Sequence, residues 1–442
     1  MKSAIVWVFG GIMFPAELVP FLKKGTKLGL MVQFAFMMKA NAAADFGPAA
    51  LLPKGRYQAV VRFGDVSHIQ QKYSSSGELQ GPERMNKRFS NEFLRKIPDA
   101  KRLIHLMNSQ NPRKAEGDAL DMGELMVQGK AKVDYIAPQL ARGMTSKWTL
   151  GMAIPVVNYK SDVTTANGGV NNAAELLNEY ADDRNLGLIS EGIKPALVKA
   201  VKQGPSQATS VIMNSSDYHY REISPRNEQF MGDVIVGSVY QIYTSPKWDL
   251  YLTNELTLPT GPKQDPDDLL SLPIFGKTAL KNTLYNNFPV NYWLTFGLGL
   301  SYTWNIPDQM TKRVPRYDGD FLPPDSTKEN LDRDPGDSVG FQLASIFKLT
   351  DYFDLGAGYE MEFRGKDRYS GGKGTSRYDL LENNTGQEAQ YVKLKLTYST
   401  VTSYFNGTSK IPYQVTYAFA DMVGGVNIER QFTNELLLKF YF

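Results

Sequence analysis

The sequence predicts an all-β fold, an antiparallel transmembrane β-barrel of about 12 strands with long, partly helical outer loops. The first observation behind this prediction is that apolar and polar residues alternate over stretches of about ten residues, as they do in barrel strands. The second is that short and long connections alternate between these stretches. The third is the share of aromatic residues, 12%, which suits girdles at two membrane interfaces.

Composition and charge exclude several other classes of protein. The chain has 442 residues and a net charge of +3, without a basic run, so no nucleic-acid partner is expected. Its 0 cysteines exclude cysteine nucleophiles and thiolate metal sites, and they fit a protein that crosses an oxidising periplasm. Beyond the N-terminal region, no stretch reaches the roughly 18 apolar residues of a membrane helix. If the chain spans a bilayer, it does so with strands.

The N-terminal region, residues 1–44, has the pattern of a secretory signal peptide. Lys23, Lys24 and Lys27 supply a basic segment, Leu28–Met38 is apolar, and small residues follow it. The mature chain is therefore expected to begin near Asp45, with the barrel over residues 45–442. Residues 1–22 are interpreted as the product of a start codon assigned too early, with a membrane anchor as the alternative.

The end of the chain shows the alternation best. One face, broken only by Asn434, is apolar and carries Phe432, Leu436, Leu438, Phe440 and Phe442. The other face carries Glu435 and Lys439 and suits a wet lumen. Phe440 and Phe442, on an alternating strand at the C-terminus, resemble the signal read by the barrel assembly machinery of Gram-negative outer membranes. We therefore expect that machinery and outer-membrane lipid as partners.

Similar stretches recur along the chain and define the remaining strands. The alternation is faintest in the sixth stretch. The predicted spans are 55–72, 120–138, 146–160, 230–244, 247–259, 277–287, 291–305, 337–350, 352–367, 387–402, 411–422 and 427–442.

The connections between these spans support a barrel in a membrane. Every second connection is short, whereas most of the others are long, and outer-membrane barrels have short periplasmic turns and long outer loops. The loops at 73–119 and 161–229 are therefore expected outside the cell. Both contain stretches with helical periodicity, Asp99–Met107 and Ser190–Val201. Such helices either fold over the barrel mouth or pack against each other above the membrane.

Catalytic and metal-binding patterns are sparse in this sequence. Asp217 and His219 would share one face of a strand, but no nucleophile motif accompanies them, so we do not expect an enzyme. Acidic residues gather at Asp265, Asp267 and Asp268 and again at 332–337, but neither group completes a calcium loop. No metal and no cofactor are expected.

Charged residues on the polar faces of the predicted strands are the candidates for the lumen lining. Their signs are mixed, so they are expected to form cross-strand ladders or to leave a polar channel without strong ion preference. Gly297, Gly299, Gly356 and Gly358 leave open space beside them. The candidates are Arg56, Arg62, Lys130, Lys132, Asp134, Asp249, Glu255, Lys348, Glu360, Glu362, Arg364, Lys393 and Lys395.

One hairpin in the middle of the chain carries a family resemblance. Met231–Gly237 begins with a Gly-Asp pair before a strand, and Glu255–Gly261 ends the next strand with Leu-Pro-Thr-Gly. The pair resembles the phenol-degradation MetA-pathway family of barrel proteins, which are similar to FadL-type channels for hydrophobic compounds. The resemblance implies uptake of aromatic compounds, although it fixes no binding residues. The long loop at 161–229 departs from it.

Two hypotheses for the function follow. The first is passive passage of small molecules, including hydrophobic or aromatic ones, across the outer membrane. The alternative is a non-conducting surface platform whose outer loops bind a partner. The interior of the barrel distinguishes them, because only the first needs an accessible lumen.

Overall fold

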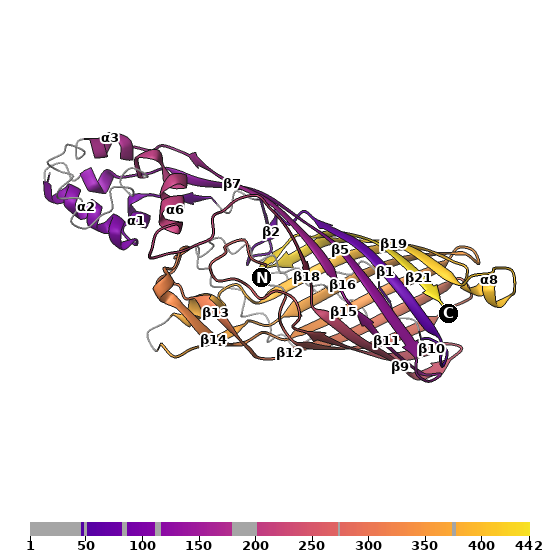
Figure 1. Ribbon diagram of the computed structural model, residues 1–442. Helices are drawn as coiled ribbons and strands as arrows, with labels where there is room; N and C mark the ends of the chain where they lie inside the picture. Colours follow the sequence, from indigo (N-terminus) through magenta and orange to yellow (C-terminus); the bar gives the residue numbers. More distant parts are fainter. Residues whose placement is uncertain are drawn as a thin grey trace, which may run out of the picture.

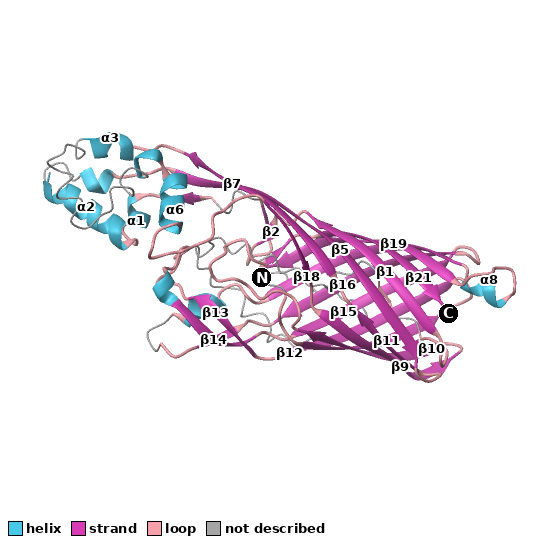
Figure 2. Ribbon diagram, viewed as in Figure 1, coloured by secondary structure: helices cyan, strands magenta, loops and turns pink. Residues whose placement is uncertain are grey.

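A computed structural model describes residues 46–47, 51–81, 86–110, 116–178, 201–272, 275–373 and 377–442. Its main feature is a closed barrel of 12 antiparallel strands (Figures 1 and 2), which confirms the predicted fold class. No described helix is long and apolar enough to cross a membrane. The predicted signal peptide lies outside the described residues.

The barrel strands agree with the predicted spans to within a few residues at most ends. In chain order they are β1 (Tyr57–Ser67), β5 (Glu124–Gly143), β6 (Trp148–Ala153), β9 (Val234–Ser245), β10 (Trp248–Leu258), β11 (Ala279–Pro289), β12 (Leu294–Asn305), β15 (Ser338–Lys348), β16 (Phe353–Arg364), β18 (Gln387–Ser399), β19 (Tyr413–Val426) and β21 (Phe432–Tyr441).

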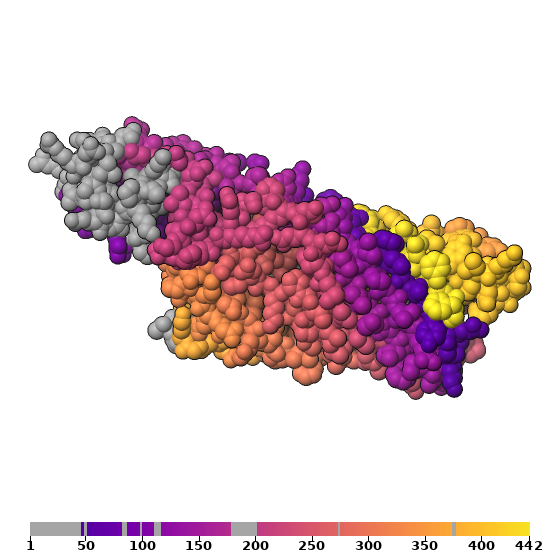
Figure 3. All heavy atoms as spheres, in the orientation of Figure 1, coloured from indigo at the N-terminus to yellow at the C-terminus, as the bar shows by residue number. Residues whose placement is uncertain are grey.

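The first and last strands close the barrel. β21 pairs with β1 in a continuous register, in which Gln58 lies opposite Tyr441. At the C-terminus, the Tyr57 amide donates to the Phe442 carbonyl at 2.7 Å, and the two rings stack at a centroid distance of 5.8 Å. Figure 3 shows the yellow C-terminal atoms against the indigo atoms of β1. No strand of the closed wall is left with an unpaired edge along this seam.

The outer face of the wall is apolar and is bounded by aromatic residues. Leu298, Leu300 and Leu343 lie on it in mid-strand, as the alternation predicted. Near the short turns, ring pairs such as Trp293 with Phe347 and Tyr352 with Tyr398 lie within about 6.2 Å of each other. An apolar band with aromatic residues at its border is the outer surface of a transmembrane barrel.

Two strands break where they leave the wall. After β6, Ile154 and Pro155 interrupt the third strand, which continues as β7 (Val156–Gly168). Opposite, Gly232 and Asp233 separate β8 (Arg226–Met231) from β9. The Gly232 amide donates to the Pro155 carbonyl at 2.8 Å and holds the two breaks together. Because proline has no amide proton for a ladder, the break at Pro155 has a direct cause.

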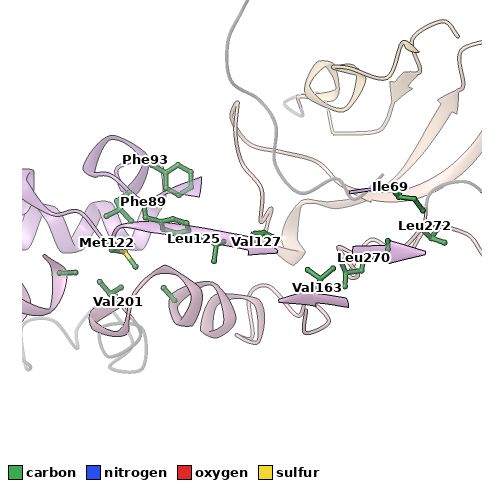
Figure 4. Close-up of a cluster of buried hydrophobic side chains, with 14 of the residues drawn as sticks. Ile69, Phe89, Phe93, Met122, Leu125, Val127, Val163, Val201, Leu270 and Leu272 are labelled. Atoms are coloured by element: carbon green, nitrogen blue, oxygen red, sulfur yellow. The ribbon is translucent and has the colours of Figure 1, made fainter. Parts of the chain in front are cut away.

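Beyond the breaks, the first part of β5, residues 124–136, pairs with β7 and carries a helical module away from the wall (Figures 1 and 2). The module contains α1 (Asn91–Leu94), α2 (Pro98–Gln110), α3 (Ala173–Asn178) and α6 (Pro205–Met213). Figure 4 shows its buried core, where Phe89, Leu125 and Val201 come from separate segments. Of the two alternatives for the loop helices, the described helices agree with the second, because they pack against each other in a module beyond the end of the barrel (Figure 1). The stretch 190–200 lies outside the described residues.

Smaller sheets and ion pairs order the remaining long loops. β13 (Asp308–Arg313), β14 (Lys328–Asp334) and β17 (Arg368–Ser370) form one sheet, and β2 (Lys72–Tyr73), β3 (Leu79–Gln80) and β20 (Ile428–Glu429) form another. Asp267 accepts from Arg313 at 2.6 Å and from Lys328 at 2.8 Å. Burial opposes ionisation of Asp267, but these hydrogen bonds and charges hold its pKa below the usual value. The Asp267 carboxylate thus stabilises the loops through ion pairs with Arg313 and Lys328.

Candidate channel lumen

The barrel encloses a cavity of about 520 Å³. Residues from eleven of the 12 wall strands line it. On several strands the lining follows the alternation: Gln58, Val60 and Arg62 of β1, and Lys393 and Lys395 of β18, line the cavity. The cavity is therefore the interior of the barrel rather than a cleft on its surface.

One ion pair crosses the closing seam inside the barrel. Arg62 on β1 and Glu435 on β21 approach to 3.3 Å, and the Glu435 side chain is fully buried. The Tyr135 hydroxyl on β5 donates to the same carboxylate. A buried carboxylate requires such compensation, because transfer out of water strongly disfavours an isolated charge. These three strands are therefore tied together from within.

A second group of charges lies on β15, β16 and β18. Lys393 and Glu360 are 2.8 Å apart, and the Gln342 amide donates to Glu360 at 3.2 Å. On β10 and β11, Glu255 lies opposite Lys281 in the ladder. Side chains opposite each other in an antiparallel pair are close enough for favourable opposite-charge contacts. The predicted charge ladders are thus present in part of the wall.

The cavity lining as a whole is cationic. The described residues that line it include five cations, Arg62, Lys281, Lys393, Lys395 and Lys439, but two carboxylates, Glu255 and Glu360. The mixed signs of the predicted lining led us to expect no strong ion preference, but the structure places several of those charges outside the cavity. A positive lining raises the local concentration of anions.

Part of the N-terminal segment lies inside the barrel. Phe46 is 4% exposed and lies among the residues that line the cavity. A Cβ atom on Gly358 would come within 3.3 Å of the Phe46 ring, and one on Gly356 within 3.0 Å. The space that these glycines were expected to leave open is therefore occupied. Likewise, the Tyr285 ring covers Gly299, where a Cβ atom would come within 2.8 Å.

Three predicted lumen residues lie on the other face of β5. Tyr135 points into the barrel, so Lys130, Lys132 and Asp134 point outward, and Asp134 pairs there with Lys132 at 2.8 Å and with Lys160 at 3.6 Å. The expectation failed because β5 extends beyond the wall. The apolar residues at 125, 127 and 133 pack in the core of the helical module instead of facing lipid.

The other predicted residues divide between the cavity and its ends. Arg62, Glu255, Glu360, Lys393 and Lys395 line the cavity.

Four of the remaining candidates lie near the ends of the strands. Arg56 is exposed before β1, and Lys348 pairs with Asp351 at 2.8 Å beside a short turn. Asp249 accepts a hydrogen bond from Thr244 at 2.5 Å next to another turn. Arg364 pairs with Asp367 at the opposite end of the wall. Glu362 shares the inward face of β16 with Glu360 but lies outside the cavity lining.

Several lining residues were missed from the sequence. Lys281 and Tyr285 belong to β11, where the alternation was faintest, so they were not weighed as candidates. Lys281, Thr283 and Tyr285 are two residues apart and therefore share one face of the strand. This two-residue spacing is the signal that could have identified them. Phe46 precedes the first strand, and no periodic pattern indicates its place.

The Gly-Asp and Leu-Pro-Thr-Gly motifs hold a loop together and do not form a binding site. Asp233 is buried and accepts hydrogen bonds from the Gly261 amide at 2.8 Å and from the Gly276 amide at 3.0 Å. The Thr260 hydroxyl accepts from the Val234 amide at 2.9 Å. The two motifs therefore fix the loop between β10 and β11 to the break before β9.

Replacing Asp233 by alanine should lower the free energy of local unfolding of this loop by about 1–3 kcal/mol, because two amides lose their hydrogen-bond acceptor. Hydrogen exchange at the Gly261 and Gly276 amides should accelerate. The exposed Asp265 in the same loop provides the control, and Asp265→Ala should leave both amides protected. Unchanged exchange in Asp233→Ala would show that other contacts hold the loop.

A closed antiparallel barrel with an apolar outer band and a polar, charged interior is the architecture of outer-membrane proteins. The chain is an outer-membrane β-barrel. Asp217 and His219 lie in a turn above it, so the shared strand face on which a catalytic pairing would depend is not formed.

Comparison with known proteins gives structural likenesses only. No family model matches the chain, and no curated protein matches it. The COG4313 outer membrane channel from Pseudomonas putida F1 is 12% identical, with a TM-score of 0.49 over 90% of this chain and 100% of that chain. The Ralstonia pickettii toluene transporter TbuX is 9% identical, with a TM-score of 0.33 over 89% of this chain and 90% of the other. The NanC porin is 11% identical, with a TM-score of 0.30 over 72% of this chain and 98% of the other. Likenesses of this strength carry no argument about function, which must come from the lumen itself.

Proposed function

We propose that this barrel is a passive outer-membrane channel for small molecules, including aromatic ones. The observation that carries the proposal is the cavity of about 520 Å³ inside the wall, lined by charged, amide and hydroxyl side chains together with apolar ones such as Val60, Val239 and Leu437. A barrel of this strand number is wider than those of about eight strands, whose side chains fill the interior. The cavity is also in the range of sites that hold small organic molecules.

The lining suits passage of polar or anionic solutes better than passage of cations. Ion pairs such as Lys393 with Glu360 keep part of the charge compensated within the wall. The excess of cations over carboxylates remains directed at the cavity and lowers the energy of an anion there. The resemblance of the β9–β10 hairpin to the MetA-pathway family supports the aromatic part of the proposal.

The test is to narrow the lumen at one strand position and to change the adjacent lipid-facing position as a control. Gly237 lines the cavity, and a Cβ atom there would meet only ordinary contacts, the shortest at 3.6 Å. Gly237→Trp should therefore reduce the conductance steps of the protein in planar bilayers several-fold, by filling the path. Val236→Trp, on the opposite face of β9, should leave the steps unchanged.

The surface platform is the second candidate function. The observation in its favour is the helical module, which β5 and β7 carry away from the wall (Figure 1). Under that function the wild-type protein would be electrically silent in bilayers and would pass no aromatic solute into liposomes. Equal conductance of Gly237→Trp and the wild type would also contradict passage through this cavity.

A further inference from the structure

The environment of Phe46 has the composition of a binding site for an aromatic ring. One side of the ring lies against the bare backbone of Gly356 and Gly358 on β16, where even a methyl group would crowd it. The Lys395 ammonium lies 4.5 Å from the ring centroid, within the range of a cation–π contact. The ring is therefore held by a flat backbone surface and a cation.

The same lysine also recognises an oxygen atom. Its ammonium donates a hydrogen bond to the Phe46 carbonyl oxygen. Lys395 thus binds an aromatic ring and an oxygen acceptor that belong to one residue. A small molecule with a carboxylate beside a ring carries the same two groups, and its charge would make the hydrogen bond stronger than the bond to a neutral carbonyl.

The surroundings favour an anion at this position over a neutral ring. Lys393 lies on the same inward face of β18 as Lys395, and Lys439 of β21 also lines the cavity. Arg62 is compensated by Glu435, and Asp354 lies close enough to Lys395 to interact with it electrostatically. The four lysines of the described lining still outnumber its two carboxylates, Glu255 and Glu360, which favours an anion in the cavity. The open volume of the cavity adjoins Phe46 and gives a solute access to the subsite.

We propose that the lumen contains a binding site for small aromatic carboxylates, formed by Lys395, Gly356 and Gly358 and occupied in this structure by the chain's own Phe46. The proposal rests on the proposed channel function, for which it names the solute class. Phe46 acts as a tethered competitor. A solute binds only in the fraction of molecules from which the Phe46 ring has withdrawn, so its apparent affinity is lowered by that fraction.

The experiment measures binding separately from transport. The full chain in detergent is titrated with para-fluorobenzoate, and binding is followed by the broadening of the fluorine NMR line. Phe46→Ala should strengthen binding by roughly tenfold or more, because it removes the competitor. Phe405→Ala is the matched control, because Phe405 is exposed at the end of the short helix α8 (Val401–Phe405), and it should leave the affinity unchanged.

Two further variants test the lysine and the glycine surface. In the Phe46→Ala protein, Lys395→Gln should weaken binding by roughly tenfold through loss of the charge-assisted bond and the cation–π contact. Lys410→Gln, at an exposed position, should not change it. Gly358→Val should abolish binding by filling the place of the ring, and the heat stability of the barrel in detergent verifies that each variant is folded.

Ligand controls decide the chemical class. A fluorinated cyclohexanecarboxylate keeps the charge without the aromatic ring, and para-fluorobenzyl alcohol keeps the ring without the charge. Both should bind more weakly than para-fluorobenzoate. Equal binding of all three, or affinities indifferent to Phe46→Ala and Lys395→Gln, would overturn the proposal. Because binding is measured without flux, aromatic carboxylate binding by an electrically silent protein would refute the channel function and leave the site standing.

Discussion

Replacing Leu298 by arginine should destabilise the folded barrel by about 2–4 kcal/mol, the range for a cation near the bilayer midplane on the lipid side of a strand. Leu298 lies near the middle of β12 and points outward, next to Leu343 of β15. An arginine there would have no polar group of the lumen within its reach. The measurement is equilibrium unfolding by urea in lipid vesicles.

Ser301→Arg is the matched control for the opposite face of the same strand. Ser301 faces inward between Thr283 and Gly340, where the polar interior can hydrate a guanidinium. Its free energy of unfolding should remain within about 1 kcal/mol of the wild-type value, as for most tolerated substitutions. Equal losses in both variants would indicate a strand that is buried on two faces, which is incompatible with a lipid-facing wall.

Deletion of Phe442 should strongly reduce the amount of protein that inserts into the outer membrane. The residue directly follows β21, which closes the barrel, and its backbone exchanges two hydrogen bonds with Tyr57, at 2.7 and 3.0 Å. Its ring also stacks on Tyr57. The deletion thus removes both the expected assembly signal and the final contact of the seam.

The measurement for this deletion is the heat-modifiable, folded fraction in isolated outer membranes after a pulse of synthesis. Deletion of Phe405, an exposed aromatic residue at the end of the short helix α8 between β18 and β19, is the control and should leave insertion near normal. Normal insertion of the Phe442 deletion would show that neither the terminal ring nor its hydrogen bonds are needed for assembly.

The alternation of apolar and polar residues predicted the barrel strands well, because one physical constraint determines which residues face lipid. Where a strand has neighbours on both sides and lipid on one face, every second residue must be apolar. The rule fits β16 and β18, where Glu360, Lys393 and Lys395 line the cavity. A hairpin with short turns also fixes the register, so the ends of these strands were predictable.

The same rule could not predict β5, β7 or the occupant of the lumen. An apolar face indicates burial but does not distinguish lipid from a protein core, so the residues that pack beneath the helices looked like lipid-facing ones. Pro155 lies inside a predicted span and was the available signal of the break. The position of Phe46 depends on contacts with β16 and β18, more than three hundred residues away, which no local pattern encodes.

The seam between β1 and β21 also has a consequence for the order of folding. It joins segments separated by nearly the whole chain, so the loop that must close is the longest one available and the step is entropically unfavourable. Hairpins between consecutive strands can form earlier, which leaves β1 and β21 as exposed edges until the last step. Exposed edges pair readily with other chains. The period between secretion and closure is therefore when this protein is most prone to aggregate, and a periplasmic chaperone that covers strand edges should slow aggregation most during that period.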